Sequence, residues 1–217
     1  MKMNTFSIAI DKARVAEMPV VEFSGPIVLV DSEDKLDSAL ADLNAHSIVG
    51  FDTETKPSFK KGCANKVALM QLSTDNCNYL IRLNRIGIPE KLKSFLENES
   101  IVKVGLSIHD DFSVMRRSTP LEPKGFVELQ HYVRQFCIKD SSLQKIYAIV
   151  FGKRISKKQR LTNWEAQELT PQQQAYAALD SWACLHIYRY LSEGKFDAAR
   201  SPYIVVPETE ACDEQQK

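Results

Sequence analysis

Short apolar runs bounded by turn residues recur through the first half of the chain and predict buried strands. These runs occupy residues 27–30, 47–54, 66–73, 78–83 and 101–106. The runs 66–73 and 78–83 are joined by the turn-rich segment 74–76, so they predict two strands of an antiparallel meander.

Apolar residues at helical spacing follow these runs, and a capping residue or a proline precedes most of the sets. The predicted helices begin after Asp31 or Ser32, after Pro89, near Asp110, after Asp140 or Ser141, and at Pro171. The last helix has the strongest boundary signals, because Thr170 can cap it, Gln173 completes a capping box and Gly194 follows its end. After the helix near Asp110 the chain is predicted to be mainly helical.

The order of these elements predicts one α/β domain with a mixed central sheet, antiparallel in its first three strands and flanked by helices. The length of 217 residues fits one globular domain with short extensions, at roughly 150 residues per domain. Residues 1–26 lack a clear period and are predicted to be an N-terminal extension. Residues 196–217 are predicted to be an acidic tail, because carboxylates outnumber bases after residue 207. The domain is therefore expected at 27–195.

Composition narrows the class of protein. No stretch approaches the ~20 apolar residues of a membrane span, and no charged segment precedes an apolar block at the N-terminus, so the protein is expected to be cytoplasmic and without a membrane partner. The five cysteines are scattered without a CxxC pair, which argues against disulfides and a zinc cluster. The 28 basic and 28 acidic residues cancel, so any nucleic-acid partner must be argued from local features.

Several carboxylates occupy positions where a core residue is expected. Asp52 directly follows an apolar run, and the period of a strand places Glu54 on the same face. Asp180 lies in the middle of the last helix between apolar residues, with Tyr176 one turn earlier on the same face. The alternatives are that Asp52 ends the strand, that Glu54 is solvated, and that Asp180 pairs with an arginine in the core.

A third acidic cluster, Asp110-Asp111, stands at a junction between strand and helix, where acids usually act as caps or dipole partners. The combination of the three clusters nevertheless indicates a site for hard divalent cations, which prefer carboxylate ligands. His109 is the one histidine in these clusters, so zinc is not the preferred metal. Two Mg²⁺ or Mn²⁺ ions about 3.5 to 4 Å apart would clamp a phosphodiester.

These residues resemble a known family. FDTET at 51–55, KVALMQLS at 66–73, KVGLSIHDD at 103–111, TNWEAQELTPQQQAYAALD at 162–180 and the following SWACLHIYRYL resemble the DEDDy-type 3′-to-5′ exonucleases of the RNase H-like superfamily. The likeness covers residues 27–193. It is greatest to the Werner-syndrome-type exonuclease domain and smaller to bacterial RNase D.

The resemblance implies a role for each residue of the motif. Asp52 would bridge both metals, Glu54 and Asp180 would complete one site, and Asp111 would serve the second metal through water. Asp111 is preferred to Asp110 because it aligns with the family aspartate when 103–105 is held in register. Tyr176 stands where a sister group has histidine and would orient the attacking water. Its phenol, with an ordinary pKa near 10, acts as a hydrogen-bond partner and not as a strong base.

Contacts to nucleic acid are predicted at two places. A pocket for the 3′-terminal nucleotide would use the Thr53 backbone, Met70 and His109, each of which has a packing or solvated alternative. The basic runs 153–160 and 56–66 can neutralise phosphates. Lys157 and Arg160 fall where the exonucleases also have bases. Solvated loops are the alternative for both runs, and Trp164 is expected to pack under its loop.

The sequence thus predicts a metal-dependent 3′-5′ exonuclease that acts on a free 3′ end and releases nucleoside 5′-monophosphates by a two-metal mechanism. DNA is preferred to RNA as the substrate, because the sequence lacks the helical domain expected after the exonuclease domain of RNase D. The alternatives are an RNase D-like exoribonuclease and a catalytically inactive nucleic-acid-binding module on the same fold. Any helicase or other repair partner is expected to be a separate chain of unknown identity.

Overall fold

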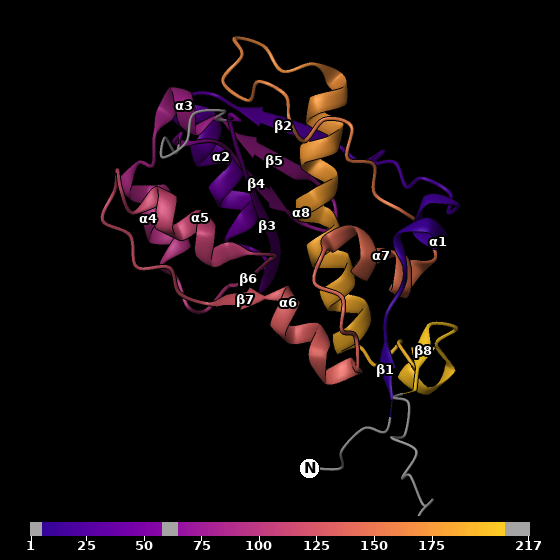
Figure 1. Cartoon of the computed structure of the whole chain (residues 1–217). Helices are drawn as coiled ribbons and strands as arrows, with labels where there is room; N and C mark the ends of the chain where they lie inside the picture. Colours follow the sequence, from indigo (N-terminus) through magenta and orange to yellow (C-terminus); the bar gives the residue numbers. More distant parts are fainter. Residues whose placement is uncertain (1–5, 58–64, 207–217) are drawn as a thin grey trace, which may run out of the picture.

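A mixed six-stranded sheet forms the centre of the protein in a computed structural model, which describes residues 6–57 and 65–206. The strand order is β2-β5-β4-β3-β6-β7 (Figure 1). The strands are β2 (Ile27–Val30), β3 (Ile48–Thr55), β4 (Val67–Ser73), β5 (Asn78–Ile81), β6 (Val102–Gly105) and β7 (Phe126–Glu128).

The predicted meander is confirmed, because β3, β4 and β5 are antiparallel neighbours. The other pairs are parallel: β2 with β5 at one edge, and β6 with β3 and β7 at the other. The sheet is therefore mixed as predicted, while β2, which precedes the meander along the chain, adds to it in the parallel sense.

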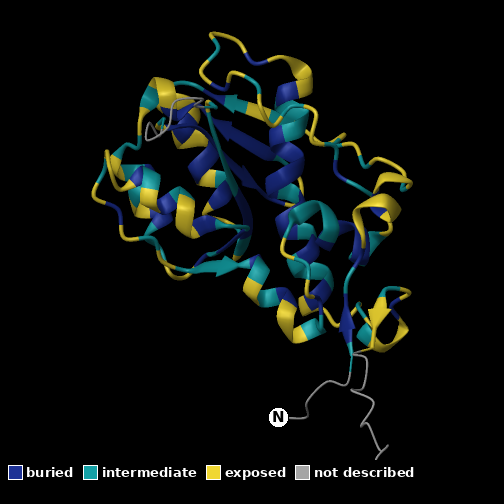
Figure 2. Ribbon diagram, in the orientation of Figure 1, coloured by how far each residue is buried: buried dark blue, intermediate teal, exposed yellow. Residues whose placement is uncertain are grey.

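Helices cover both faces of this sheet (Figure 1). One face carries α2 (Glu33–Leu43), α3 (Leu83–Ile86), α4 (Glu90–Leu96) and α5 (Ile108–Met115). The other carries α7 (Leu143–Phe151) and the long α8 (Pro171–Ser192), while α6 (Leu129–Tyr132) and the 3-10 turn η1 (Val133–Phe136) continue from β7. Figure 2 shows the central strands and the inner side of α8 buried between the two layers.

The long helix α8 lies directly on the sheet. Its predicted start is confirmed, with a capping box between Thr170 and Gln173. A side chain at Gly50 of β3 would overlap the backbone carbonyl oxygen of Ser181, so glycine permits the close approach of the helix. Buried polar side chains reinforce the contact, because Asn78 donates to the Ala178 carbonyl at 2.8 Å and to the Ser181 hydroxyl at 2.9 Å. These contacts fix the position of α8 relative to β3 and β5.

The two ends of the described chain pair with each other, which the sequence analysis did not predict. In the extension, β1 (Ser7–Ile8) precedes the short helix α1 (Lys12–Ala16). Beyond α8, the 3-10 turn η2 (Ala198–Arg200) leads to β8 (Ile204–Val205), which is antiparallel to β1. Two-residue strands carry too little pattern to be recognised, and their pairing depends on residues almost 200 positions apart. The acidic part of the predicted tail, after residue 206, lies outside the described residues.

Other boundaries differ in ways that matter for the site. α5 begins at Ile108, two residues earlier than predicted, after Ser107 in the left-handed region with φ of 62°. β7 was also not predicted, because three half-buried residues give no clear alternation. Cys77 and Cys184 are free thiols, in agreement with the prediction for those two residues. Within residues 6–57 and 65–206, no helix has the length and apolarity that crossing a membrane requires.

Candidate active site

Three carboxylates meet where β3 lies against α8. Asp52 and Glu54 project from the same face of β3, and Asp180 reaches them from the middle of α8. One oxygen from each of the three lies within 4.8 Å of the others. The predicted two-residue spacing on the strand and the unusual mid-helix aspartate therefore belong to one cluster. Among residues 6–57 and 65–206, no arginine forms an ion pair with Asp180 of the kind that the alternative required.

The electrostatics of the cluster disfavour three negative charges. Burial, followed by the charges of Asp180, Glu54 and Asp111, raises the pKa of Asp52 well above its usual value. Burial and the charges of Asp180 and Asp111 raise the pKa of Glu54 to about 9. Burial also raises the pKa of Asp180 to about 7, although a hydrogen bond from Tyr176 opposes this. A bound cation would relieve this repulsion.

Asp111 lies at the edge of the cluster. The Thr53 hydroxyl donates a hydrogen bond of 2.7 Å to its Oδ1 atom, and its charge contributes to the raised pKa values of Asp52 and Glu54. Burial raises the pKa of Asp111 to about 7. The neighbouring Asp110 is exposed. The structure therefore brings Asp111, and not Asp110, towards the other three carboxylates.

Glu128 at the end of β7 holds the helix that carries Asp111. Its carboxylate accepts hydrogen bonds from the backbone N–H groups of Ser107 and Ile108, both at 3.0 Å, and of Gln130 at 3.1 Å. The left-handed Ser107 directs its own N–H and that of Ile108 to the same side chain. Glu128 could not be predicted from the sequence, because an isolated glutamate after a short strand carries no local signal for a contact with residues 20 positions away.

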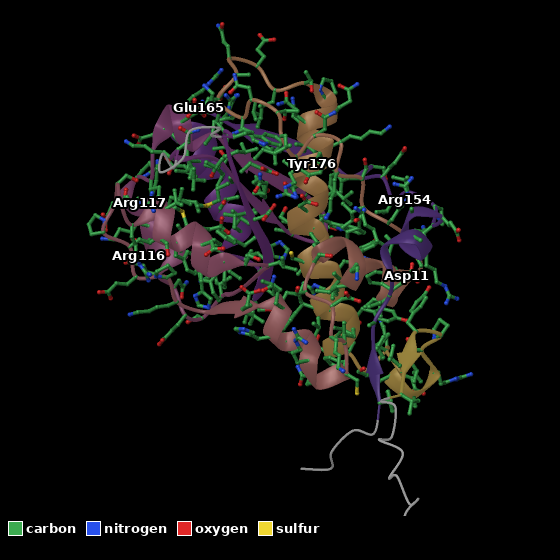
Figure 3. The ribbon with its side chains drawn as sticks, viewed as in Figure 1. Asp11, Arg116, Arg117, Arg154, Glu165 and Tyr176 are labelled. Carbon is green, nitrogen blue, oxygen red and sulfur yellow. The ribbon has the colours of Figure 1, made fainter. Side chains whose placement is uncertain are left out.

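Tyr176 completes the cluster from α8, one turn before Asp180 (Figure 3). Its hydroxyl is hydrogen-bonded to the Asp180 carboxylate. Burial, followed by the charges of Asp180 and Glu54, raises the pKa of the phenol far above its ordinary value. The phenol is therefore protonated at neutral pH and acts as a hydrogen-bond donor, as the sequence analysis expected.

A cavity of about 430 Å³ opens beside the cluster, and Asp52, Tyr176 and Asp180 line it together with two bases, Lys157 and Arg160. The charge of Arg160 lowers the pKa of Glu54 and that of Lys157 lowers the pKa of Asp180, which places both bases near the carboxylates. Residues that sequence reasoning did not select also line it: Leu106, Ser107, Gln130, Ser141, Ser142, Leu143, Gln144 and Ile155.

The other residues predicted to contact a nucleotide have different surroundings. Met70 is fully buried in the apolar core, so the prediction of a nucleotide contact is wrong for its side chain in this conformation and the packing alternative holds. His109 is exposed in the first turn of α5 and does not line the cavity. Thr53 lies beside the carboxylates and uses its hydroxyl to hold Asp111. Trp164 is fully buried and packs near Tyr176, as expected.

The second basic run has no described contact with this cavity. Lys56 forms an ion pair of 3.2 Å with Glu165, in the loop before α8. Lys66 is exposed and lines a separate hollow beside α5. Lys60 and Lys61 lie outside the described residues. The solvated-loop alternative therefore fits Lys56 and Lys66.

The donor set fits a hard divalent cation. Asp52, Glu54, Asp111 and Asp180 offer carboxylate oxygens, and neither a thiol nor an imidazole belongs to the described cluster. Oxygen ligands of this kind suit Mg²⁺ or Mn²⁺. Asp52, Glu54 and Asp180 lie close enough together to share one ion.

Comparison with known proteins extends these observations. A family model described as a 3′-5′ exonuclease matches residues 27–194. The mouse bifunctional 3′-5′ exonuclease/ATP-dependent helicase WRN is 34% identical over 185 residues, which cover 80% of this chain and 13% of the mouse protein. A 3′-5′ exonuclease of Arabidopsis thaliana is 28% identical over 201 residues, which cover 85% of this chain and 69% of that protein.

Solved structures confirm the fold. The EXO domain of Aedes aegypti Nibbler superposes with a TM-score of 0.68 at 24% identity, covering 83% of this chain and 96% of that one. Escherichia coli RNase D, described as an exoribonuclease involved in structured RNA processing, superposes with a TM-score of 0.67 at 24% identity, covering 77% and 44%. The architecture is therefore the RNase H-like α/β fold that the sequence predicted.

Proposed function

The chain belongs to the 3′-5′ exonuclease family, and from this membership we propose that it removes nucleoside 5′-monophosphates from the 3′ end of a nucleic acid strand. The proposed cofactors are two divalent cations, Mg²⁺ or Mn²⁺. The proposed catalytic domain is 27–195, between an N-terminal extension, 1–26, and a C-terminal segment, 196–217.

One observation carries the proposal: carboxylate oxygens of Asp52, Glu54 and Asp180 lie within 4.8 Å of one another, and Asp52 and Asp180 line a cavity that Lys157 and Arg160 also line. Placing acids close together in a partly buried site is unfavourable without a cation, because each ionised carboxylate raises the free energy needed to ionise the next one. The cluster therefore supports a cation-binding role over a purely structural one.

The residues of the site would have separate roles in the proposed reaction. When bound, the divalent cations would activate water and stabilise the charge that develops on the phosphate. Asp52, Glu54, Asp111 and Asp180 would hold them. Tyr176 donates its hydroxyl hydrogen to Asp180, so its oxygen would orient the attacking water by accepting a hydrogen bond from it. Lys157 and Arg160 bring positive charge to the cavity, where the scissile phosphate would lie.

We propose DNA as the substrate. The chain is more similar to the mouse exonuclease/helicase, at 34% identity, than to the exoribonuclease of Escherichia coli, at 24%. RNA is the alternative substrate, and the experiment that tests the activity also compares the two.

The test is a digestion series with the wild type on single-stranded DNA, 3′-recessed duplex DNA and RNA of the same sequence, each labelled at the 3′ or the 5′ end. With Mg²⁺ or Mn²⁺, the 3′ label should leave first as a mononucleotide, while the 5′ label stays on progressively shorter strands. DNA should be digested faster than RNA.

Asp52→Asn should lower the rate at least about 10³-fold, since it removes a ligand shared by the cluster. Asp110→Asn is the matched control, because this exposed aspartate lies one residue from Asp111 and should leave the rate within about twofold. Loss of the 5′ label first, or an unchanged rate in Asp52→Asn, would contradict the proposal. Strand binding without digestion would support the inactive binding module.

A further inference from the structure

An extended segment beside α8 separates two cavities. This strap, residues 154–160, begins in extended conformation after α7 and ends in a turn before α8. Successive side chains of extended backbone point to opposite sides, and Ile155 and Lys157 accordingly face the active-site cavity. Arg154, Ser156 and Lys158 face a second cavity of about 460 Å³ on the other side. The basic run recognised in the sequence therefore supplies bases to both cavities.

The second cavity combines an apolar wall with positive charge. Val21 and Phe23 of the N-terminal segment and Ala175 and Leu179 of α8 form the apolar part. Arg154, Lys158, Gln159 and Gln172 supply polar groups, and Glu22 is the carboxylate among the lining residues. A volume of several hundred Å³ with an apolar wall and a few polar groups is typical of a ligand site.

The two walls of this cavity are held together by backbone hydrogen bonds. The Arg154 N–H donates to the Pro19 carbonyl, and the Val21 N–H donates to the Arg154 carbonyl, both at 2.9 Å. The Nε–H of Arg154 also donates to the Met18 carbonyl at 3.0 Å, which fixes the guanidinium on the wall (Figure 3). The strap and the N-terminal segment therefore form one framed site.

We propose that this second cavity binds the nucleotide that precedes the 3′-terminal one on the same strand. The inference rests on the proposed exonuclease function. The base would lie on the apolar wall of Val21, Phe23 and Leu179, and the phosphate would face Lys158 and Arg154. Positive grooves with apolar or aromatic walls bind single strands in this manner, without reading sequence.

The position of the cavity favours the same strand over a complementary one. Tyr176 lines both cavities, and the strap contributes side chains to each of them, so the two cavities adjoin. Consecutive nucleotides of one strand are directly linked and can occupy adjoining sites, whereas the complementary strand of a duplex lies across a groove roughly 6 to 12 Å wide. A single strand whose last nucleotide enters the active-site cavity can therefore place its preceding nucleotide beyond the strap.

The first test is the salt dependence of binding of a 5′-fluorescent single-stranded dT12, measured by anisotropy in EDTA. Each phosphate contact to a single strand contributes about 0.7 to the slope of log affinity against log salt. Lys158→Ala should reduce this slope by about 0.7, so that its affinity falls about 2.6-fold less than that of the wild type between 50 and 200 mM salt.

Lys153→Ala is the matched control, because this exposed lysine belongs to the same basic run but lines neither cavity. It should keep the wild-type slope. Glu22→Gln should tighten binding at low salt, since it removes the negative charge that faces the phosphate. Equal slopes for the wild type, Lys158→Ala and Lys153→Ala would overturn the inference. Weaker binding by Glu22→Gln than by the wild type would also overturn it.

A second arm repeats the binding with the same dT12 annealed to a longer dA strand that leaves its 3′ end recessed. For a site that holds the same strand, Lys158→Ala should change the slope for the single strand and for the recessed duplex alike. A change confined to the duplex would assign the cavity to the complementary strand and refute the proposal. Binding is measured without turnover, so it tests the second cavity separately from the nuclease activity. If the wild type binds dT12 but never releases its 3′ nucleotide, the proposed function is wrong and the binding result still stands.

Discussion

The two halves of β3 belong to one strand but lie in opposite environments. In the first half, Val49 and Phe51 are fully buried, and Gly50 lies against the backbone of α8. In the second half, Asp52 and Glu54 face other carboxylates beside the cavity. The apolar half fixes β3 and α8 relative to each other. The carboxylates of the acidic half repel one another, and this fixed packing keeps them close together. Stability and chemistry are thus assigned to successive residues of a single element.

The substitution with the largest expected effect is Gly50→Ala, in the apolar half of β3. The added Cβ would overlap the Ser181 carbonyl oxygen, so α8 must move and carry Asp180 away from Asp52. We expect a loss of about 3 kcal/mol in stability and at least a 100-fold loss of nuclease activity, measured by thermal melting and by 3′-label release.

Gly194→Ala serves as the control for this change. Gly194 has a φ of 70° and open space at its Cβ position, so it should lose only about 1 kcal/mol and keep its activity. Full activity in a folded Gly50→Ala protein would show that the site tolerates displacement of α8.

A change confined to the acidic half is Tyr176→Phe. It removes the hydroxyl that bonds Asp180 and leaves the ring in place. We expect kcat to fall about 100-fold, with the melting temperature nearly unchanged. Tyr190→Phe, on the same helix but away from the cluster, should keep full kcat. A drop in melting temperature that accounts for the lost activity would instead assign Tyr176 a structural role.

The smallest expected effect is on the folding stability of the metal-free protein, which the carboxylates of the acidic half lower as they ionise. The pKa values of Glu54 and Asp180 are raised to about 9 and about 7, so the folded state keeps protons that the unfolded chain releases near pH 4. Folding stability should therefore be greatest below about pH 4 as far as these groups are concerned, and their contribution should be lost as the pH rises to about 9.

Melting temperatures in EDTA test this expectation. They should fall by several degrees between pH 6 and pH 9, at about 2 to 4 °C per kcal/mol. Mn²⁺ should restore them, and both changes should be smaller in Asp180→Asn. Equal Mn²⁺ shifts in the wild type and in Asp180→Asn would argue against a metal site at this residue.

Local pattern predicted the parts of the site that depend on nearby residues. The spacing of Asp52 and Glu54 on a strand and of Tyr176 and Asp180 on a helix determines which side chains share a face. The capping box at Thr170 likewise determines where α8 begins. Family resemblance, and not periodicity, distinguished Asp111 from Asp110, and the Thr53 hydrogen bond now gives a physical reason for the difference.

Contacts between distant segments could not be predicted in this way. The bond from Ser107 to Glu128 depends on a left-handed residue whose type does not reveal it, and the approach of Gly50 to α8 depends on the packing of a whole helix. Met70 was misassigned because a strand buried on both faces offers no alternation to show which residues reach a surface.

The pairing of β1 with β8 has a mechanical consequence. Ser7 is opposite Val205 and Ile8 is opposite Ile204, so the chain leaves the pair from the same end on both strands. A force that separates the two ends would act in the unzipping direction, on one pair of residues at a time. These short strands would open before tension reached the central sheet. A pull on the two ends would therefore open this pair before it disturbed the geometry of the carboxylates.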